Sequence, residues 1–341
     1  MRKLLMMLVV VSALMVSAVF GDGGAGVEWT LVKSSPFGGS GIYAIAYGKD
    51  KFVAVGDKGK IAYSSDGVSW TAVKNTAFDK DNSISAIAWG KDRFIAGGYS
   101  EAGESDIIGS MAYSLDGINW KKVNDFFNPV DAIVWGDGKF VVSYSGGGGG
   151  GVGIAYSSDG ITWTHIDSPF TGGESIDVSW GNNKFVAISS VYGSEIASSS
   201  DGITWSNATA SPFNSDSHIS RTVWGKDKFV AKGSDLSRES CRFAYSSNGI
   251  AWTAINNGPF GDSRILVSDI AYGNGKFVVG GGSYDRREQT YRKCKLAYSS
   301  DGIAWVIVNK YPFGNKRANA IGWGNGMFVA GSSDGQIAYS K

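Results

Sequence analysis

The sequence is poor in the residues that hold metals and has no excess of either charge. Among 341 residues there are 2 His, 2 Cys and 6 Pro. Because zinc sites are built mainly from Cys and His, no metal centre and no cofactor are expected. The 32 Lys and Arg balance 31 Asp and Glu, for a formal net charge of +1. Nucleic acid, which needs a basic binding surface, is therefore not an expected partner.

The first residues have the pattern of a secretory signal peptide. Arg2 and Lys3 precede an apolar run from Leu4 to Val19, and Gly21 follows it. The run of about sixteen residues is shorter than the roughly twenty that a spanning helix needs, so a membrane anchor is the less favoured interpretation. We expect a signal peptide at 1–21 and a mature chain at 22–341 without a membrane span. That chain would be secreted or periplasmic, without a lipid anchor, because no Cys lies near the cleavage point.

One pattern repeats along the chain about every 40 to 50 residues, the period of a propeller blade. Each unit contains an apolar run that ends in an aromatic residue and Gly, a KFVA-like run, an IAYS-like run and a run that follows a Trp. Four short runs separated by turn residues predict four strands. The aromatic residues that end the first run occur in seven units: Tyr47, Trp89, Trp135, Trp180, Trp224, Tyr272 and Trp323. The sequence therefore predicts an all-β protein, a single seven-bladed propeller of four-stranded antiparallel blades.

The two ends of the repeat complement each other. Residues 27–33 match the fourth run of a unit, and residues 337–341 match the third. We expect the N-terminal strand to complete the last blade, because this arrangement closes the ring and leaves no open seam.

Six copies of a Ser-x-Asp-Gly-x-x-Trp segment, with Asn in place of Asp in one, precede the last run of a unit. They resemble the Asp-box of sialidase-like (BNR-repeat) propellers, which has one more residue between Asp and Gly. Ser and Asp side chains can accept N–H groups of a tight turn, and Asn can make the same bonds. A structural role is thus favoured over a calcium site, because each segment offers at most one carboxylate whereas calcium takes six to eight oxygen ligands. The residues concerned are Asp66, Asp116, Asp159, Asp201, Asn248 and Asp301.

The resemblance implies an architecture but no activity. Sialidases use an arginine triad, a Tyr–Glu pair, an Asp acid/base and an Arg-Ile-Pro element near their start. This chain has no Arg-Ile-Pro, and no Arg lies between residue 22 and Arg93. No catalytic residue can therefore be assigned. We favour a non-catalytic binding or scaffold protein for a protein or glycan partner. A glycoside hydrolase or lyase with a non-standard active site is the alternative.

The variable loops follow the second run of each unit, so they should lie on the same side of the ring as the connections between blades. We call this side the loop-insertion face, and insertions in repeat proteins often form the binding face. One insertion is rich in aromatic residues and Arg, which are typical of recognition surfaces. A solvated charged loop is the alternative. The candidate binding residues in it are Tyr284, Arg286, Arg287 and Tyr291.

A second candidate site comes from comparing the units with one another. Three residues before the strand-ending aromatic residue, four units have Ala, whereas three consecutive units have Asp177, Arg221 and Asp269. A salt bridge that joins blades four to six is the favoured interpretation. A ligand anchor, or the carboxylate pair of a glycosidase, is the alternative. The Arg between them should lower the pKa of both carboxyl groups.

The two cysteines occupy equivalent places in neighbouring units. Cys241 and Cys294 each lie five residues before the Ser of an Asp-box-like segment. Packed sheets are about 10 Å apart, and a disulfide needs Cα atoms roughly 4.4–6.8 Å apart. Both residues end long insertions, where the chain can deviate. A disulfide and two free thiols therefore both remain open.

Overall fold

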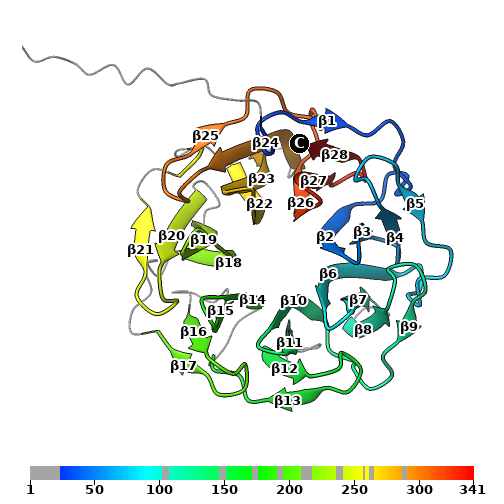
Figure 1. Ribbon diagram of the computed structural model, residues 1–341, viewed down its shortest axis with the longest axis vertical. Coiled ribbons are helices and arrows are strands. Elements are labelled where there is room, and N and C mark those ends of the chain that lie inside the picture. Colours follow the sequence, from blue (N-terminus) through cyan, green and yellow to red (C-terminus); the bar gives the residue numbers. More distant parts are fainter. Residues whose placement is uncertain are drawn as a thin grey trace, which may run out of the picture.

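The ring of blades is described by a computed structural model for residues 24–101, 107–145, 151–170, 176–189, 195–208, 217–235, 241–255, 258–260, 265–285 and 290–341. Its strands form seven four-stranded antiparallel sheets, which stand as blades around a central axis (Figure 1). The predicted seven-bladed all-β propeller is confirmed. Within the described ranges, no helix has the length and apolar character needed to span a bilayer.

Each blade has its shortest strand at the rim, and the blades follow one another along the chain. The strands of blades one to three are β2 (Ile42–Gly48), β3 (Lys51–Gly56), β4 (Ile61–Ser64), β5 (Thr71–Ala72), β6 (Asn82–Gly90), β7 (Arg93–Glu101), β8 (Ile107–Ser114), β9 (Lys121–Lys122), β10 (Val130–Gly136), β11 (Lys139–Tyr144), β12 (Gly153–Ser157) and β13 (Thr164–Ile166).

The remaining blades have the same order from the axis to the rim. Their strands are β14 (Ile176–Gly181), β15 (Lys184–Ser189), β16 (Ile196–Ser199), β17 (Ser206–Asn207), β18 (Ser217–Gly225), β19 (Lys228–Asp235), β20 (Cys241–Ser246), β21 (Thr253–Ile255), β22 (Ile265–Gly273), β23 (Lys276–Asp285), β24 (Thr290–Ser299), β25 (Val306–Ile307), β26 (Ala318–Gly324), β27 (Met327–Ser332), β28 (Ile337–Ser340) and β1 (Thr30–Leu31).

The N-terminal strand closes the ring as expected. β1 pairs antiparallel with β28, with Thr30 opposite Tyr339. The pairing continues beyond the strand, because the Val32 N–H donates to the Ile337 carbonyl over 2.8 Å. Before the strand, the Gly26 N–H donates to the Ser340 hydroxyl, also over 2.8 Å. The seventh blade therefore contains both ends of the described chain.

The repeated aromatic–Gly pair forms a contact between neighbouring blades. A Cβ on Gly48 would lie 2.1 Å from the Trp89 ring, and one on Gly324 would lie 2.1 Å from the Tyr47 ring. Only a residue without a side chain fits under the ring of the next blade. The same contact completes the circle at five further positions: Gly90, Gly136, Gly181, Gly225 and Gly273. The aromatic residues of the inner strands thus serve packing.

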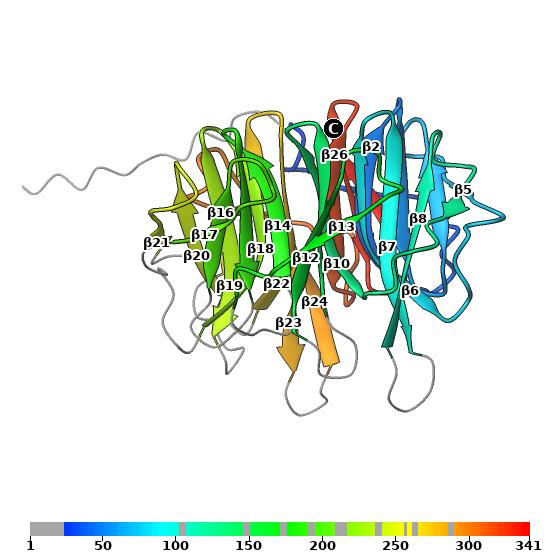
Figure 2. The same cartoon turned by 90° about the horizontal axis from the view of Figure 1, so that it is seen from below.

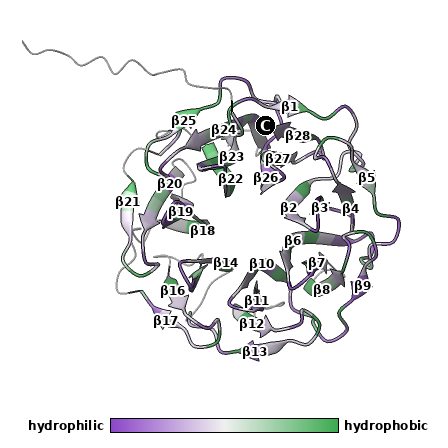
Figure 3. Cartoon of the chain, viewed as in Figure 1, coloured by the Kyte–Doolittle hydropathy of each residue, from purple (hydrophilic) through white to green (hydrophobic). Residues whose placement is uncertain are grey.

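Seven hydrophobic clusters lie between adjacent blades rather than in one central core. Hydrophobic residues are accordingly spread over all the blades (Figure 3). A Phe from the connection that leads into a blade fills the edge of most clusters, which explains the recurring Pro-Phe pair. These side chains are at most 6% exposed: Phe37, Phe126, Phe170, Phe260 and Phe313.

The two faces of the ring differ in regularity. On one face lie the Asp-box-like turns and the short hairpins between first and second strands, such as Lys49–Asp50, where both residues have positive φ (46° and 56°). This left-handed pair is the geometry of a two-residue type I′ turn. On the loop-insertion face the connections vary, and β23 and β24 extend beyond the disc (Figure 2).

The Asp-box-like turn is held by its own side chains. The Ser64 hydroxyl accepts the Gly67 N–H at 2.8 Å, and Asp66 Oδ1 accepts the N–H groups of Val68 and Ser69 at 2.8 and 2.7 Å. Gly67 has φ of 73°, where a side chain would be strained. The same three bonds occur in the box that carries Asn in place of Asp.

We expect Asp66→Ala to reduce the free energy of unfolding by about 1 kcal/mol, because two turn N–H groups lose their acceptor. Asp66→Asn should stay within a few tenths of that of the wild type at pH 7, since Asn248 makes the same bonds. The N–H of Ser69 and then that of Val68 lower the Asp66 pKa to about 2. The stability of the wild type relative to Asp66→Asn should therefore be constant above about pH 4 and fall as the pH falls towards 2. Urea unfolding of both variants across this range measures it.

Candidate functional site

Three buried or half-buried carboxyl groups lie on β10, β14 and β22, which are innermost strands around the axis (Figure 1). Each accepts a backbone N–H of the next inner strand: Asp131 from Ile176 at 3.4 Å, Asp177 from Thr222 at 2.7 Å, and Asp269 from Ile321 at 2.7 Å. An innermost strand has no sheet neighbour on its axial side, so its polar groups need other partners. The carboxyl groups supply these partners and tie successive blades together.

The expected charged trio is only partly assembled. An Arg221 guanidinium nitrogen lies 3.5 Å from Asp177 Oδ1, while about a third of the Arg221 side chain remains exposed. No ion pair between Arg221 and Asp269 occurs among the salt bridges of the described residues. Asp269 instead accepts the N–H of Ile270 in its own strand, at 2.9 Å. The ion pair thus joins blades four and five, and Asp269 is bound to blade seven.

The comparison of a single position in the first strands missed two charged residues of this layer. Lys232, 3% exposed, stands opposite Arg221 on β19 and donates to the Val267 carbonyl at 2.6 Å and to the Ser220 hydroxyl at 2.8 Å. Asp131 lies at an irregularity of β10, one residue before the compared position. The same comparison made on second strands would have found Lys232, since the other six positions there are Val55, Gly97, Ser143, Ile188, Gly280 and Gly331.

Arg221 lowers the pKa of Asp177 and Asp269 as expected, but the net shift of both carboxyl groups is upward. Burial raises the pKa of Asp177, although Arg221 opposes the shift. Burial likewise raises the pKa of Asp269 to about 6 and that of Asp131 to about 7. The loss of hydration outweighs the attraction of a guanidinium that is itself partly in water. These carboxyl groups therefore hold their protons more tightly than ordinary Asp.

We expect the stability of the protein to fall relative to Asp131→Asn as pH rises from about 5 to 8. The folded pKa of Asp131, about 7, lies above the ordinary 3.8, so the folded state binds more protons between these values. The contribution of Asp131 is thus greatest below pH 4 and is lost as pH approaches 7. The relative change should be about 1–2 kcal/mol. Denaturant unfolding at pH 5 and 8 measures it, and parallel curves for the two proteins would contradict the burial argument.

The aromatic and arginine residues of the longest hairpin are only partly described. Tyr284 and Tyr291 stand opposite each other in the β23–β24 register. Their side chains, together with Arg286 and Arg287, lie outside the described residues. Asp269 pairs with Gly280 on the same hairpin. The hairpin therefore continues from the level of the charged layer onto the loop-insertion face.

Cys294 is a free thiol with no exposed surface. Burial raises its pKa to about 12, so the reactive thiolate is suppressed. The side chain of Cys241 lies outside the described residues. We expect two titratable thiols in the denatured, unreduced protein, and fewer than two would show that the cysteines pair.

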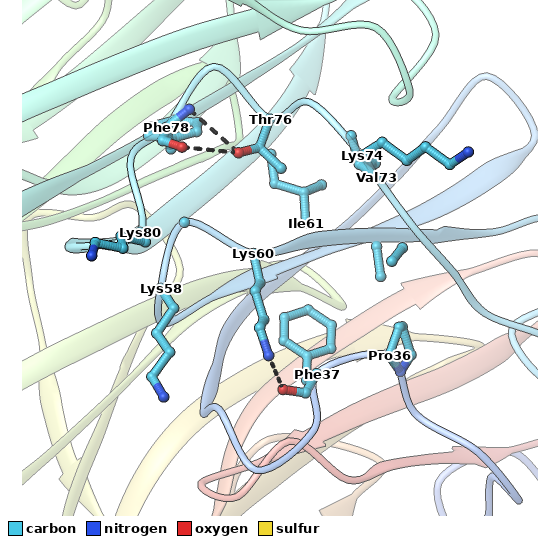
Figure 4. A pocket seen from close by; sticks show the side chains of 13 residues that line it. Pro36, Phe37, Lys58, Lys60, Ile61, Val73, Lys74, Thr76, Phe78 and Lys80 are labelled. Atoms are coloured by element: carbon cyan, nitrogen blue, oxygen red, sulfur yellow. Dashed lines mark hydrogen bonds between the residues drawn. The ribbon is translucent and has the colours of Figure 1, made fainter.

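A pocket of about 320 Å³ lies on the loop-insertion face over blade one (Figure 4). It is bounded by Pro36 and Phe37 on one side, by the β3–β4 turn at Lys58–Lys60, and by residues 72–80 on the other side. The sequence comparison did not predict this site. Among the described residues, no group of three or more His, Cys, Asp or Glu side chains is placed to hold a metal ion.

Comparison with known proteins shows the fold alone. No family model matches the sequence, and no curated protein matches it. A structure of Ycf48 bound to a D1 peptide is similar with a TM-score of 0.65 and 13% identity, covering 92% of this chain and 95% of that one. A streptogramin B lyase gives 0.69 and 10%, covering 94% and 99%. The WD40 β-propeller domain of Doa1 gives 0.58 and 14%, covering 94% and 97%. The chain is thus similar in fold to a protein bound to a peptide, to a lyase and to a WD40 domain.

Proposed function

We propose that this chain is a secreted or periplasmic, non-catalytic binding protein that holds a protein or glycan partner on its loop-insertion face. The observation that carries the proposal is the contrast between the two faces. β23 and β24 have 10 residues each and β7 has 9, whereas β4 and β28 have 4. The Asp-box-like turns on the opposite face have one constant form. Variable segments on a constant scaffold are typical of a recognition surface.

The charged layer supports binding over catalysis. Asp177 and Asp269, the carboxylate pair considered for a glycosidase, both accept backbone N–H groups of a neighbouring blade. Asp177 is additionally paired with Arg221. Carboxyl groups engaged in this way hold the blades in position, which favours a scaffold role for the inner strands.

The similar structures are consistent with a binding function but do not distinguish it from an enzymatic one. Ycf48 is described in complex with a D1 peptide, whereas another similar propeller is a lyase. At identities of 10 to 14% the same fold hosts both kinds of function.

The test is to select ligands for the mature protein from a random peptide display library and a glycan array, and then to map each by footprinting. Protection should fall on the inter-blade loops and the β23–β24 hairpin. Replacing residues 284–291 by Asn-Gly shortens that hairpin and should weaken the ligands that map to it about tenfold. Leu115→Lys, a change at a side chain 52% exposed on the opposite face, is the matched control and should leave binding unchanged. Protection confined to the Asp-box-like turns would contradict the proposal.

One observation favours the alternative of a glycoside hydrolase or lyase. Asp131 and Asp269 have pKa values of about 7 and about 6, which suit a general acid at neutral pH. A panel of fluorogenic glycosides tests this function. Turnover that is abolished by Asp131→Asn or Asp269→Asn, in a protein that remains folded, would favour the enzyme over the binding protein.

A further inference from the structure

The pocket over blade one combines four lysines with an apolar floor. Lys58, Lys60, Lys74 and Lys80 line it, and no Asp or Glu does. Lys58 and Lys60 extend to the same side of the β3–β4 turn, and Lys74 and Lys80 lie at opposite ends of the view (Figure 4). The pocket wall is therefore positively charged at several points around one opening.

The charges of these lysines are not neutralised within the described part of the chain. The ion pairs found there involve Asp137 with Lys139 and Asp177 with Arg221. Only the Lys60 ammonium is held in place, by the Phe37 carbonyl at 2.5 Å. Asp57, next to Lys58 in the chain, turns its carboxylate away towards Tyr43, Gly41 and Ser83. An anionic ligand would thus meet ammonium groups without an intramolecular competitor.

The apolar floor is open because one inter-blade loop departs from the repeat. Ala77 stands where most of the inter-blade loops have Pro, and it adopts a positive φ of 62°. The Phe78 that follows is only half-buried, although its counterparts in other loops are buried. Phe78 lines the pocket together with the buried residues Phe37, Ile61 and Ala62. An apolar side chain of a ligand can therefore contact Phe78.

The lysines are not required by the turn that carries them. In blade seven the equivalent turn closes with the same bond, from Ser332 N–H to the Gln336 carbonyl, as blade one has from Gly56 to Lys60. That turn carries Asp334 and Gln336 where blade one has Lys58 and Lys60. The backbone forms without the ammonium groups, so their concentration in blade one points to a ligand.

Building on the proposed function, we infer that this pocket binds an acidic peptide segment in which carboxylate side chains flank one apolar residue. Ammonium groups bind carboxylates as point charges with three donors each. Sugars are instead recognised by exposed aromatic faces and by side-chain amides or carboxylates placed for their hydroxyls. The pocket lining contains no Trp, Tyr, Asn, Gln, Asp or Glu. A peptide supplies both the charges and the apolar group that the site can accommodate.

The probe is a fluorescein-labelled heptapeptide with two acidic residues on each side of one phenylalanine, and its counterpart has Asn and Gln in place of the acidic residues. Fluorescence anisotropy with the mature protein should show saturable binding of the acidic peptide alone, weakening as salt is raised. Lys58→Glu and Lys80→Glu should each raise Kd about tenfold. Lys121→Glu makes the same charge change at an exposed residue of β9 outside the pocket, and it should change Kd less than twofold.

Three outcomes would overturn the inference. The pocket variants could bind as the wild type does, or the uncharged peptide could bind as well as the acidic one. A sulfated oligosaccharide could also show the same lysine dependence while the acidic peptide does not bind, which would assign the pocket to a glycan. None of these outcomes by itself contradicts the proposed binding function, because ligands selected from the libraries can still map to other parts of the loop-insertion face.

Discussion

Deleting residues 22–33 should lower the melting temperature by about 10 °C or more, because it removes the strand that closes the ring. Ala25 and Val32 are 1% and 8% exposed, and Trp29 packs against the cluster between blades six and seven. Exposing these side chains and losing the β1–β28 pairing should reduce the free energy of unfolding by about 4–6 kcal/mol. In a domain of this size each kcal/mol shifts the melting temperature by about 2–4 °C or somewhat less.

Two further variants separate closure from the loss of terminal residues in general. A chain that lacks only residues 2–21 should melt as the full chain does. Trp29→Ala should give an intermediate shift, because the backbone pairing with β28 remains while the ring contact is lost. An unchanged melting temperature after removal of residues 22–33 would show that the ring is held without its closing strand.

The architecture could be predicted from the sequence because neighbouring blades pack against one another through the same residue types at equivalent positions. The aromatic residue and the Gly that end each inner strand meet across a blade interface, so neither can vary independently. The Ser and Asp of the turn bind its own backbone, so they recur with their spacing fixed. A contact that recurs at every blade interface appears in the sequence as a regular repeat. The closing strand β1 could be predicted from the same repeat, because residues 27–33 match the fourth run of a unit.

The candidate sites were harder to predict because they are departures from the repeat. Asp177, Arg221 and Asp269 were found as exceptions at one position, and Asp177 pairs with Arg221 there. The two carboxyl groups also accept backbone N–H groups, and Lys232 lies on a different strand. The direction of their pKa shifts depends on burial, which no spacing reveals. The pocket combines Lys74, Phe78 and Lys80 of one loop with Lys58 and Lys60 of a turn in another segment. Only the folded arrangement brings these segments together.

Replacing Lys232 by Met should reduce the free energy of unfolding by about 2–4 kcal/mol at pH 8. Met keeps most of the volume of the buried side chain, so the loss reflects polar contacts and charge rather than a cavity. The Val267 carbonyl and the Ser220 hydroxyl lose their donor. Asp177 and Asp269 also lose a positive charge that favours their ionised forms.

The pH dependence of this loss distinguishes charge from simple hydrogen bonding. Burial already raises the pKa of Asp177 and of Asp269, and removal of the ammonium should raise both further. The folded state then binds more protons than the unfolded one over a wider range, so the stability of Lys232→Met should fall more steeply than that of the wild type as pH rises from 5 to 8. The difference between the two proteins should therefore shrink at pH 5.

Arg221→Ala is the matched comparison within the same layer. Its guanidinium is 3.5 Å from Asp177 and about a third exposed, so solvent replaces part of the lost interaction and the expected cost is about 1 kcal/mol. Urea unfolding of both variants at pH 5 and pH 8 gives the four values needed. A loss for Lys232→Met that is no larger than that for Arg221→Ala, or that does not change with pH, would show that the buried ammonium does not hold the charged layer together.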